Sequence, residues 1–591
     1  MIATLLSVAL LAQTGSHNDP SAQRLQSRSC HVGRKHLPAE CGTFVVPENR
    51  SLPSGRTITL HFIIIKAEHP TNRAVAFNPG GPGVSSTAEA EGLADAGRAS
   101  AFTQLRDKYN LLLVDNRGTG QSAPQNCDFD PRAHPELYFA QLWPDSLVKQ
   151  CRDRLSRHAD LSDYSTIAAA ADLDDLRAAL GYPKLVLYGG SYGTRFYLAY
   201  ARQYPEHVQS MVLDGVSPPH FEIIPLQMAE GAQVAMTALI EACKADVTCS
   251  KHFPLFKQHF AALVQRFNHG PLHMQIRNAV TNRMQTVALS KEVFVDRLRQ
   301  ALYFSSKAAY IPVIIERAYR GDYAPLSSLI DQMTHLFDGL LADGLNLSVT
   351  CAEDIPFITE GAVRRVSANS FEGDLRIRAQ QRACRIWNVK PVPAWFVDPV
   401  RSDAPILMIN GSDDPASPVS SAREALPYLP NARMLLIKGG SHDSPRPPCT
   451  DTLIVAFIRA NSAKGLDLGR CGQSYSRPPF ATLAPYESAP GEHVALTMRF
   501  RKLFQLMMSG HLDRSQLKPA VSKEFSDEVM KSFVAQVAGL GPIEGFIYKG
   551  SHPSVKGTTY LYLVHFESVD AIGSFTVDKR GRISNLDVSP G

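Results

Sequence analysis

The 591-residue sequence lacks the features that would assign it to several broad classes. No stretch reaches the roughly 18 consecutive apolar residues of a membrane-spanning helix, so we expect no integral membrane segment in the mature chain. No run of five like charges occurs, and 61 basic residues nearly balance 56 acidic ones, so we expect no nucleic-acid partner. There is no Cys-x-x-Cys motif and no histidine cluster at zinc spacing, and we predict neither a metal nor a cofactor.

What is present is an ordinary globular composition with ten cysteines, which fall into pairs of sequence neighbours. An even number in such pairs favours local disulfides and an oxidising compartment. Ten cysteines can pair in on the order of 900 ways, so the pairing of nearest neighbours is a preference. The alternative to disulfides is that all ten cysteines are buried free thiols in a cytosolic enzyme. The preferred pairs are Cys30–Cys41, Cys127–Cys151, Cys243–Cys249, Cys351–Cys384 and Cys449–Cys471.

The N-terminus also indicates export. Met1–Ala12 is an apolar run of the length of a signal-peptide core, and we expect residues 1–15 to be a signal peptide of a secreted or periplasmic protein. No lysine or arginine precedes Arg24, so the usual positive leader is missing. A misplaced start codon or a non-exported protein with an apolar end would each explain that.

Short apolar runs alternate with helical patterns along most of the chain, which predicts an α/β fold with a mostly parallel sheet covered on both faces. The alternation stops after Pro219. From there to Val397 the sequence pattern is helical, and this segment is far longer than an ordinary loop. The expected organisation is a first core segment at 25–219, an inserted helical lid at 220–397, a second core segment at 398–475, a Pro-rich linker at 476–490 and a small α+β accessory domain at 491–591.

The central motif is Gly-x-Ser-x-Gly at Gly189–Gly193. The pentapeptide alone is weak evidence for a catalytic site. However, an expected strand precedes it and an expected helix follows it, which is the context of a nucleophile elbow. Such a turn strains the serine backbone, and its close neighbours must lack side chains. We therefore predict that Ser191 is a catalytic nucleophile.

A serine hydroxyl needs a base, and in this fold class the order along the chain is serine, acid, histidine. Between Asp414 and the linker the only histidine is His442, which follows an expected strand. Asp413 and Asp414 both follow the strand at Ile406–Ile409; Asp414 is preferred because Pro415 fixes the turn behind it. The acid would orient the imidazole and stabilise the imidazolium.

An oxyanion needs backbone N–H donors. The segment Phe77–Gly83 follows a strand and is almost free of side chains. Its two prolines have no N–H, so Gly81 and Gly80 are the candidates, with Gly81 preferred. The second donor would be the N–H of Tyr192, directly after the nucleophile.

These motifs resemble those of the prolyl and tripeptidyl aminopeptidases, a branch of the α/β-hydrolase serine peptidases. Phe77–Gly83 is similar to the family's His-Gly-Gly-Pro-Gly signature, with Pro79 in place of the histidine. Asp115–Ser122, Gly189–Gly193 and Gly411–Pro415 are similar to its Asp-x-Arg-Gly-x-Gly-x-Ser segment, its elbow and its acid site. The resemblance covers about residues 40–475 and implies an exported serine exopeptidase of the tripeptidyl-aminopeptidase type. The last hundred residues resemble a nuclear-transport-factor-two-like accessory module.

An aminopeptidase must bind a free α-ammonium, which requires acidic partners in an enclosed site. Glu353 and Asp354 lie where the lid rejoins the sheet, and we expect one of them to bind the ammonium of a peptide substrate, Glu353 first. Solvated lid acids are the alternative. An esterase or lipase on the same triad remains the alternative function, since both reactions are acyl transfers.

Overall fold

The computed structural model describes residues 24–127, 129, 131, 133–220, 224–278, 283–337, 340–443, 446–537, 540–566 and 570–590. The expected signal peptide at 1–15 lies outside the described residues. The chain divides into two compact units. The first consists of Met1–Ala242, Ala261–Ala308 and Ser327–Pro478, and the second of Cys243–Phe260, Ala309–Leu326 and Pro479–Gly591.

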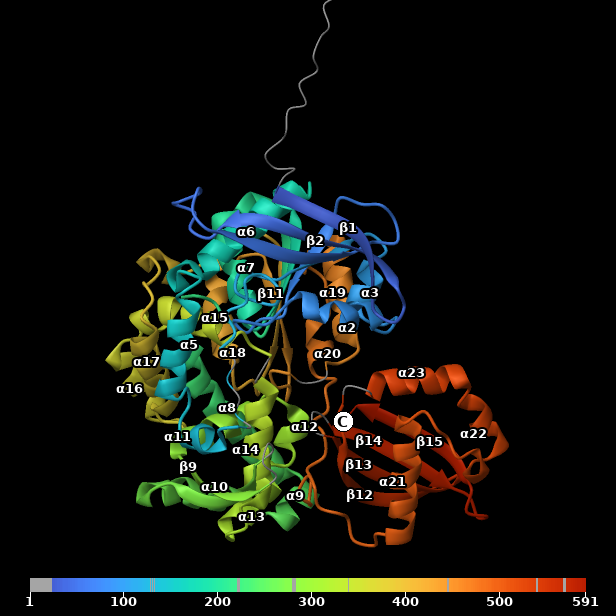
Figure 1. Cartoon of the computed structure of the whole chain (residues 1–591). Coiled ribbons are helices and arrows are strands. Elements are labelled where there is room, and N and C mark those ends of the chain that lie inside the picture. Colours follow the sequence, from blue (N-terminus) through green and yellow to red (C-terminus); the bar gives the residue numbers. More distant parts are fainter. Residues whose placement is uncertain are drawn as a thin grey trace, which may run out of the picture. The chain divides into compact units, whose positions relative to one another are not determined.

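A nine-stranded sheet forms the centre of the first unit, in the order β1-β2-β3-β5-β4-β6-β7-β10-β11 (Figure 1). Neighbours from β5 to β11 are parallel, whereas β1, β2, β3 and β5 pair antiparallel, so the sheet is mostly parallel, as the sequence predicts. The strands are β1 (Leu25–Val32), β2 (Leu37–Pro47), β3 (Thr57–Ile65), β4 (Ala74–Asn78), β5 (Asn110–Val114), β6 (Leu185–Gly190), β7 (Val208–Asp214), β10 (Ile406–Gly411) and β11 (Ala432–Ile437). The pattern-based analysis missed β1.

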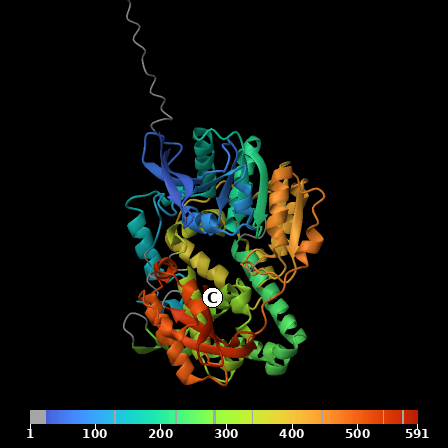
Figure 2. The same ribbon diagram turned by 90° about the vertical axis from the view of Figure 1, so that its right-hand side faces the viewer.

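Both faces of this sheet are covered. All five residues of β5 are buried, and they alternate between two hydrophobic clusters: Leu112 and Val114 belong to one, Leu111 and Leu113 to the other. Helices α6 (Thr166–Ala179) and α7 (Tyr192–Gln203) contribute to the first cluster. Helices α2 (Ala90–Asp95), α3 (Ala101–Leu105) and α19 (Cys449–Ala460) contribute to the second. Figure 2 shows the orange part of this unit beside its blue and green part, in agreement with the pairing of β10 with β7. Burial on both faces explains why these strands are continuous apolar runs in the sequence.

The inserted segment is helical with one exception that the sequence analysis missed. Residues Leu272–Arg277 (β8) and Met284–Leu289 (β9) form an antiparallel hairpin. The chain after residue 310 forms two helices, α13 (Ile311–Tyr319) and α14 (Ala324–Phe337), and Gly321 between them has a φ of 92°. The other helices of eight residues or more are α8 (Ile224–Ala245), α10 (Phe256–Arg266), α11 (Lys291–Leu302), α15 (Asp343–Glu353), α16 (Glu360–Ser367) and α17 (Leu375–Trp387).

The C-terminal part of the second unit contains a four-stranded antiparallel sheet in the order β12-β13-β14-β15. The strands are β12 (Ile543–Ser554), β13 (Gly557–Phe566), β14 (Asp570–Val577) and β15 (Ile583–Pro590). With α21 (Val494–Met508), α22 (Pro519–Glu524) and α23 (Asp527–Val537) they enclose a core rich in aromatic rings, among them Phe500 and Phe575 stacked at 4.4 Å. A separate core of this kind makes the module an α+β domain.

Five disulfides join the ten cysteines, each between sequence neighbours. Cys30–Cys41 links β1 to β2, and Cys351–Cys384 links α15 to α17. Cys449–Cys471 ties α19, which follows the loop of His442, to α20 (Leu468–Gly472). Among the described residues no helix is both long and apolar enough to cross a bilayer.

Candidate active site

Ser191 occupies the sharp turn between β6 and α7. Its φ of 52° and ψ of −123° lie outside the regions that side-chain-bearing residues favour. A Cβ on Gly189 would come within 2.5 Å of the Gly193 carbonyl carbon, and a Cβ on Gly193 would come within 2.5 Å of the Asn78 carbonyl oxygen. Both glycines are therefore required by close backbone approach, and the turn projects the serine side chain out of the sheet edge.

Three side chains from distant parts of the sequence meet at this edge. The Nε2 atom of His442 lies 3.0 Å from Oγ of Ser191, and its Nδ1 atom lies 2.8 Å from Oδ2 of Asp414. His442 follows β11 and Asp414 follows β10, so both are on loops at the carboxyl ends of parallel strands. The hydroxyl, imidazole and carboxylate thus form the continuous chain that a serine nucleophile requires.

The structure shows which of the two candidate acids contacts His442: it is Asp414. The other carboxylate oxygen of Asp414 accepts hydrogen bonds from the backbone N–H groups of Ala416 and Ser417, both at 2.8 Å. Asp413 points elsewhere: its carboxylate pairs with Arg477 and accepts from the Ser412 hydroxyl. The turn that holds Asp414 is rigid because three donors fix its side chain.

The pKa of His442 is raised above its ordinary value. Burial alone would lower it, but the charge and hydrogen bond of Asp414 outweigh burial, and Asp443 adds to them. A raised pKa strengthens the imidazole as a base, and the acid stabilises the imidazolium that forms when the serine loses its proton.

The Phe77–Gly83 segment packs closely against the turn that carries Ser191. The N–H of Gly80 is occupied because it donates to Oδ1 of Asn78 at 3.0 Å, whereas Gly81 lines the cavity in front of Ser191. A Cβ on Gly80 would stand 3.3 Å from the N atom of Tyr192, so this segment packs directly on the start of α7. Gly81 thus lines the same cavity as Ser191, and Tyr192 directly follows Ser191 in the chain; their role as oxyanion donors stays a prediction.

The Asp115–Ser122 segment anchors this glycine-rich loop, a role that the sequence motif alone did not reveal. The buried carboxylate of Asp115 accepts from the hydroxyls of Ser85 and Thr87 at 2.7 and 2.8 Å, and from the backbone N–H of Gln121 at 3.1 Å. A Cβ on Gly120 would overlap that carboxylate. Because a buried acid is satisfied here by several neutral donors, the loop that carries Gly81 is held in one position.

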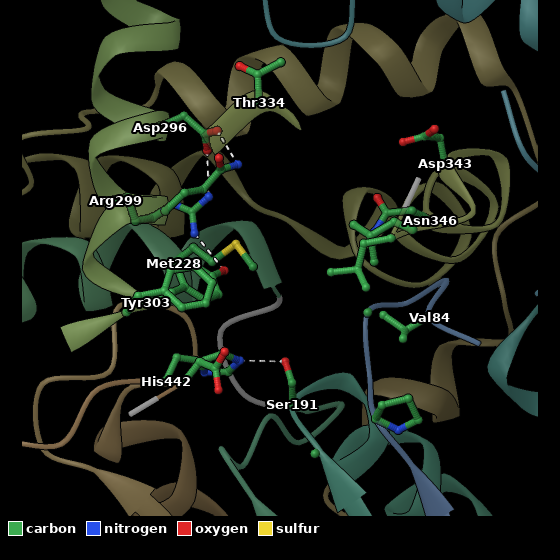
Figure 3. A pocket seen from close by; sticks show the side chains of 18 of the residues that line it. Val84, Ser191, Met228, Asp296, Arg299, Tyr303, Thr334, Asp343, Asn346 and His442 are labelled. Atoms are coloured by element: carbon green, nitrogen blue, oxygen red, sulfur yellow. Dashed lines mark hydrogen bonds and ion pairs between the residues drawn. The ribbon is translucent and has the colours of Figure 1, made fainter. Parts of the chain in front are cut away.

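A cavity of about 630 Å³ opens in front of the triad (Figure 3). Its sheet side includes Ser191, His442 and the aromatic side chains of Phe77 and Tyr188. Its lid side comes from α8, α11, α14, α15 and α17. Its volume falls in the range of about 300–1,000 Å³ that is typical of small-ligand sites.

Helix α11 of the lid supports the catalytic loop. The ring of Tyr303, just past the end of α11, meets the His442 ring edge-on at 4.9 Å, and the Tyr303 carbonyl accepts the N–H of Asp443 at 2.9 Å. Nη1 of Arg299 donates to the Tyr303 hydroxyl at 2.8 Å (Figure 3). Sequence analysis missed both residues, because nothing in an amphipathic helix indicates which loop its end will contact.

The expectation for Glu353 and Asp354 is wrong: neither side chain lines the cavity. Both are fully buried. Glu353 accepts from the N–H and hydroxyl of Thr166 at 2.6 and 2.7 Å, and Asp354 pairs with Arg195 at 2.8 Å. Burial raises the pKa of Glu353 to about 7. These acids tie the lid junction to α6 and α7, and neither belongs to the cavity wall.

Other acids do reach the cavity. Glu89 and Asp443 both line it, and burial together with the charge of Asp443 raises the pKa of Glu89. Glu89 is the last residue of the short 3-10 helix Thr87–Glu89, between β4 and α2, and Asp443 directly follows His442. They are the acids of the cavity wall closest in sequence to the glycine loop and to the catalytic histidine. Among the described residues, no group of three or more histidine, cysteine or acidic side chains could hold a metal ion.

Comparison with known proteins agrees with this geometry. Residues 73–271 match the alpha/beta hydrolase fold model, and residues 370–468 match the TAP-like protein model. The chain is 31% identical to serine protease Hip1 of Mycobacterium tuberculosis over 36% of this chain and 42% of that protein. It is 32% identical to the tripeptidyl aminopeptidase of Streptomyces lividans over 31% of this chain and 36% of that enzyme.

A third relative, carboxylesterase B of Mycobacterium tuberculosis, is 26% identical over 71% of this chain and 84% of that protein. The matches to serine protease Hip1 and to the tripeptidyl aminopeptidase each span less than half of the length of that relative. The chain thus has an α/β-hydrolase fold with a large, mostly parallel sheet, and a TAP-like segment at residues 370–468.

Proposed function

We propose that the chain is an exported serine exopeptidase that hydrolyses peptide bonds near the free N-terminus of peptides. The observation that carries the proposal is the hydrogen-bonded chain from Ser191 through His442 to Asp414 inside a lid-covered cavity. Relatives named as a serine protease and a tripeptidyl aminopeptidase support it. The five disulfides support a secreted or periplasmic location, because such bonds persist in oxidising compartments.

The proposed reaction has two acyl transfers. Oγ of Ser191 attacks the scissile carbonyl while Nε2 of His442 takes its proton, and the N–H groups of Gly81 and Tyr192 stabilise the oxyanion. Collapse breaks the C–N bond, and the imidazolium returns the proton to the leaving amine. Water, deprotonated by the same histidine, then attacks the acyl-enzyme; the C–Oγ bond breaks, the imidazolium returns the proton to Oγ of Ser191, and the N-terminal fragment leaves with its new carboxylate. No other reactant is needed.

The lid over the cavity favours chain ends over the interior of folded proteins. A free α-ammonium that enters loses hydration and needs a carboxylate. Glu89 and Asp443 take the place of Glu353 and Asp354 in this proposal, because they line the cavity and the charge of one raises the pKa of the other. An arriving cation relieves the repulsion between these two acids.

The test uses four matched substrates: a tripeptidyl anilide and the corresponding ester, each with a free or an acetylated amino end. We expect the free-amino anilide to be cleaved, and acetylation to lower kcat/KM by at least tenfold. Glu89→Gln should reduce this preference mainly through KM, because one of two acids is lost. Cleavage of esters alone would support a carboxylic ester hydrolase, the second candidate, which the similarity to carboxylesterase B favours.

A further inference from the structure

The lid side of the cavity carries a buried group of charges that the proposed chemistry does not use. We call it the roof cluster: Asp296, Arg297, Arg299, Glu372 and Arg376. Helix α11 supplies the first three, and residues at and before the start of α17 supply the other two. Figure 3 shows Asp296 and Arg299 on the lid side of the cavity that Ser191 and His442 also line. The nucleophile and the roof cluster thus share one cavity.

Asp296 is the hub of the roof cluster. One of its oxygens accepts from Arg299 at 2.7 Å and from Arg376 at 2.6 Å. The other accepts from Arg297 at 2.8 Å and from Gln300 at 3.0 Å. The lone pairs of this carboxylate are thus filled, and Asp296 has no capacity left for a substrate cation.

Cations outnumber anions in the roof cluster. Three guanidinium groups face two carboxylates, and burial raises the pKa of Glu372 to about 7, so that this acid is only partly charged at neutral pH. The pKa of Arg297 is lowered, first by burial and also by the charges of Arg376 and Arg299, as expected where positive charge is not balanced. Uncompensated buried charge is costly. Two arginines would balance the two carboxylates, so a cluster that only joined α11 to the start of α17 would not need a third arginine.

The surplus charge lies at the cavity wall. Arg297 and Arg376 both line the cavity, with side chains only 12% exposed. Nε of Arg376 is buried and has no hydrogen-bond partner among the described residues. The ring of Trp143, which also lines the cavity, lies 5.1 Å from the guanidinium carbon of Arg376 and restrains its plane. The bond to Asp296 uses Nη1 of Arg376, and a restrained guanidinium that is only partly hydrogen-bonded within the described residues is suited to an anion.

We propose that Arg376, assisted by Arg297, binds a carboxylate of the substrate, so that the enzyme prefers short peptides carrying an acidic group. This rests on the proposed peptidase function and assigns the substrate class of the same site. Glu89 and Asp443 belong to loops of the sheet and Arg376 to a lid helix, so one cavity offers partners for both charges of a zwitterionic peptide. The carboxylate comes either from the C-terminus of the peptide or from an aspartate or glutamate side chain.

The test measures binding, by calorimetry, to the full-length Ser191→Ala protein. Ala-Ala-Ala is compared with its C-terminal amide, and Ala-Ala-Asp amide with Ala-Ala-Asn amide. The first pair detects recognition of the C-terminus and the second detects recognition of a side chain. We expect the carboxylate member of at least one pair to bind tenfold or more tightly, and Arg376→Met to remove that preference, because a charged hydrogen bond is lost.

Arg446→Gln is the matched control, because Arg446 also lines the cavity but is paired with Asp214. It removes the same charge and should leave the preference within about twofold. If Arg376→Met does not fold, as judged by thermal unfolding, Arg376→Lys replaces it; lysine keeps a charge near Asp296 but loses the planar fork, and the preference should fall severalfold. Equal binding within both pairs, or a preference that survives substitution of Arg376, would overturn the inference.

The proposed function is read separately, from cleavage of a neutral tripeptidyl anilide by the unmodified protein. Cleavage without any preference for carboxylates would contradict only the roof-cluster inference. Absence of cleavage of any amide would contradict the peptidase function instead, whatever the binding measurements show.

Discussion

The sheet side and the lid side of the cavity use charge in opposite ways. On the sheet side, one carboxylate, Asp414, serves one imidazole, and backbone N–H groups satisfy the rest of it. On the lid side, Asp296 binds three arginines at once and cations remain in excess. The sheet side is built to move one proton, whereas the lid side is built to hold fixed charge. The proposed function and the roof-cluster inference therefore assign chemistry and selectivity to different elements, and substitutions on the two sides should have different effects.

The largest effect should come from the nucleophile. Ser191→Ala, or His442→Ala, should lower kcat by roughly 10⁶ without changing the unfolding temperature appreciably, because members of such a triad act as a unit. Steady-state kinetics on the preferred anilide, with circular dichroism as the folding control, measures both. If a substantial rate persisted in the Ser191→Ala protein, the hydrolysis would have to proceed at another site.

The acid should come next, with a control one residue away. Asp414→Asn should lower kcat by about 10⁴, because the amide stabilises the wrong imidazole tautomer. Asp413→Asn should be mild, since Asp413 contacts Arg477 and Ser412 and not His442. The comparison of the two asparagine variants under the same conditions decides the assignment; a reversed order of effects would refute it.

On the lid side the main expected effect is on stability. Asp296→Asn leaves three arginines without their shared partner and should reduce the free energy of unfolding of the first unit by about 3–5 kcal/mol. Glu353→Gln is the control, because Glu353 is equally buried but is bonded to the neutral Thr166, and it should cost about 1 kcal/mol. Urea unfolding of both variants measures this difference. Equal losses would mean that burial, not charge, determines the cost.

The smallest effect should be a shift in pH dependence. The base must be neutral, so kcat/KM should rise with pH through a pKa above that of an ordinary histidine, since the pKa of His442 is raised. Asp443→Asn removes an anion that raises this pKa, so the acidic limb should move to lower pH. The blocked ester is the substrate of choice, because it has no ammonium for Asp443 to bind. The shift should shrink at high salt. A limb that moves to higher pH would contradict the electrostatic argument.

The difference between the two sides also explains which parts of the structure could be predicted from the sequence. The elbow, the Asp414 turn and the His442 loop are each local motifs at strand ends, so their geometry is encoded within a few residues. The short apolar runs that predict the parallel sheet correspond to described strands between Ala74–Asn78 and Ala432–Ile437, because buried parallel strands are continuous apolar runs.

The side-chain contacts within the lid could not be predicted from local motifs in the same way. Asp296 and Arg376 are 80 positions apart, and their meeting depends on how two amphipathic helices pack. Glu353 was expected in the cavity because it lies at the lid junction, but a junction position does not reveal which face of α15 points inwards. The β8–β9 hairpin was missed because short strands inside a helical segment give little periodic signal.

The central claim is that His442 and Asp414 activate Ser191, and covalent labelling tests it most directly. The full-length protein would be incubated with a fluorophosphonate, which reacts with activated serines, and digested for mass spectrometry. We predict one adduct, on Ser191, that is strongly reduced in His442→Ala and persists in Asp413→Asn. An adduct on a different residue, or equal labelling of Ser191 with and without His442, would contradict the account.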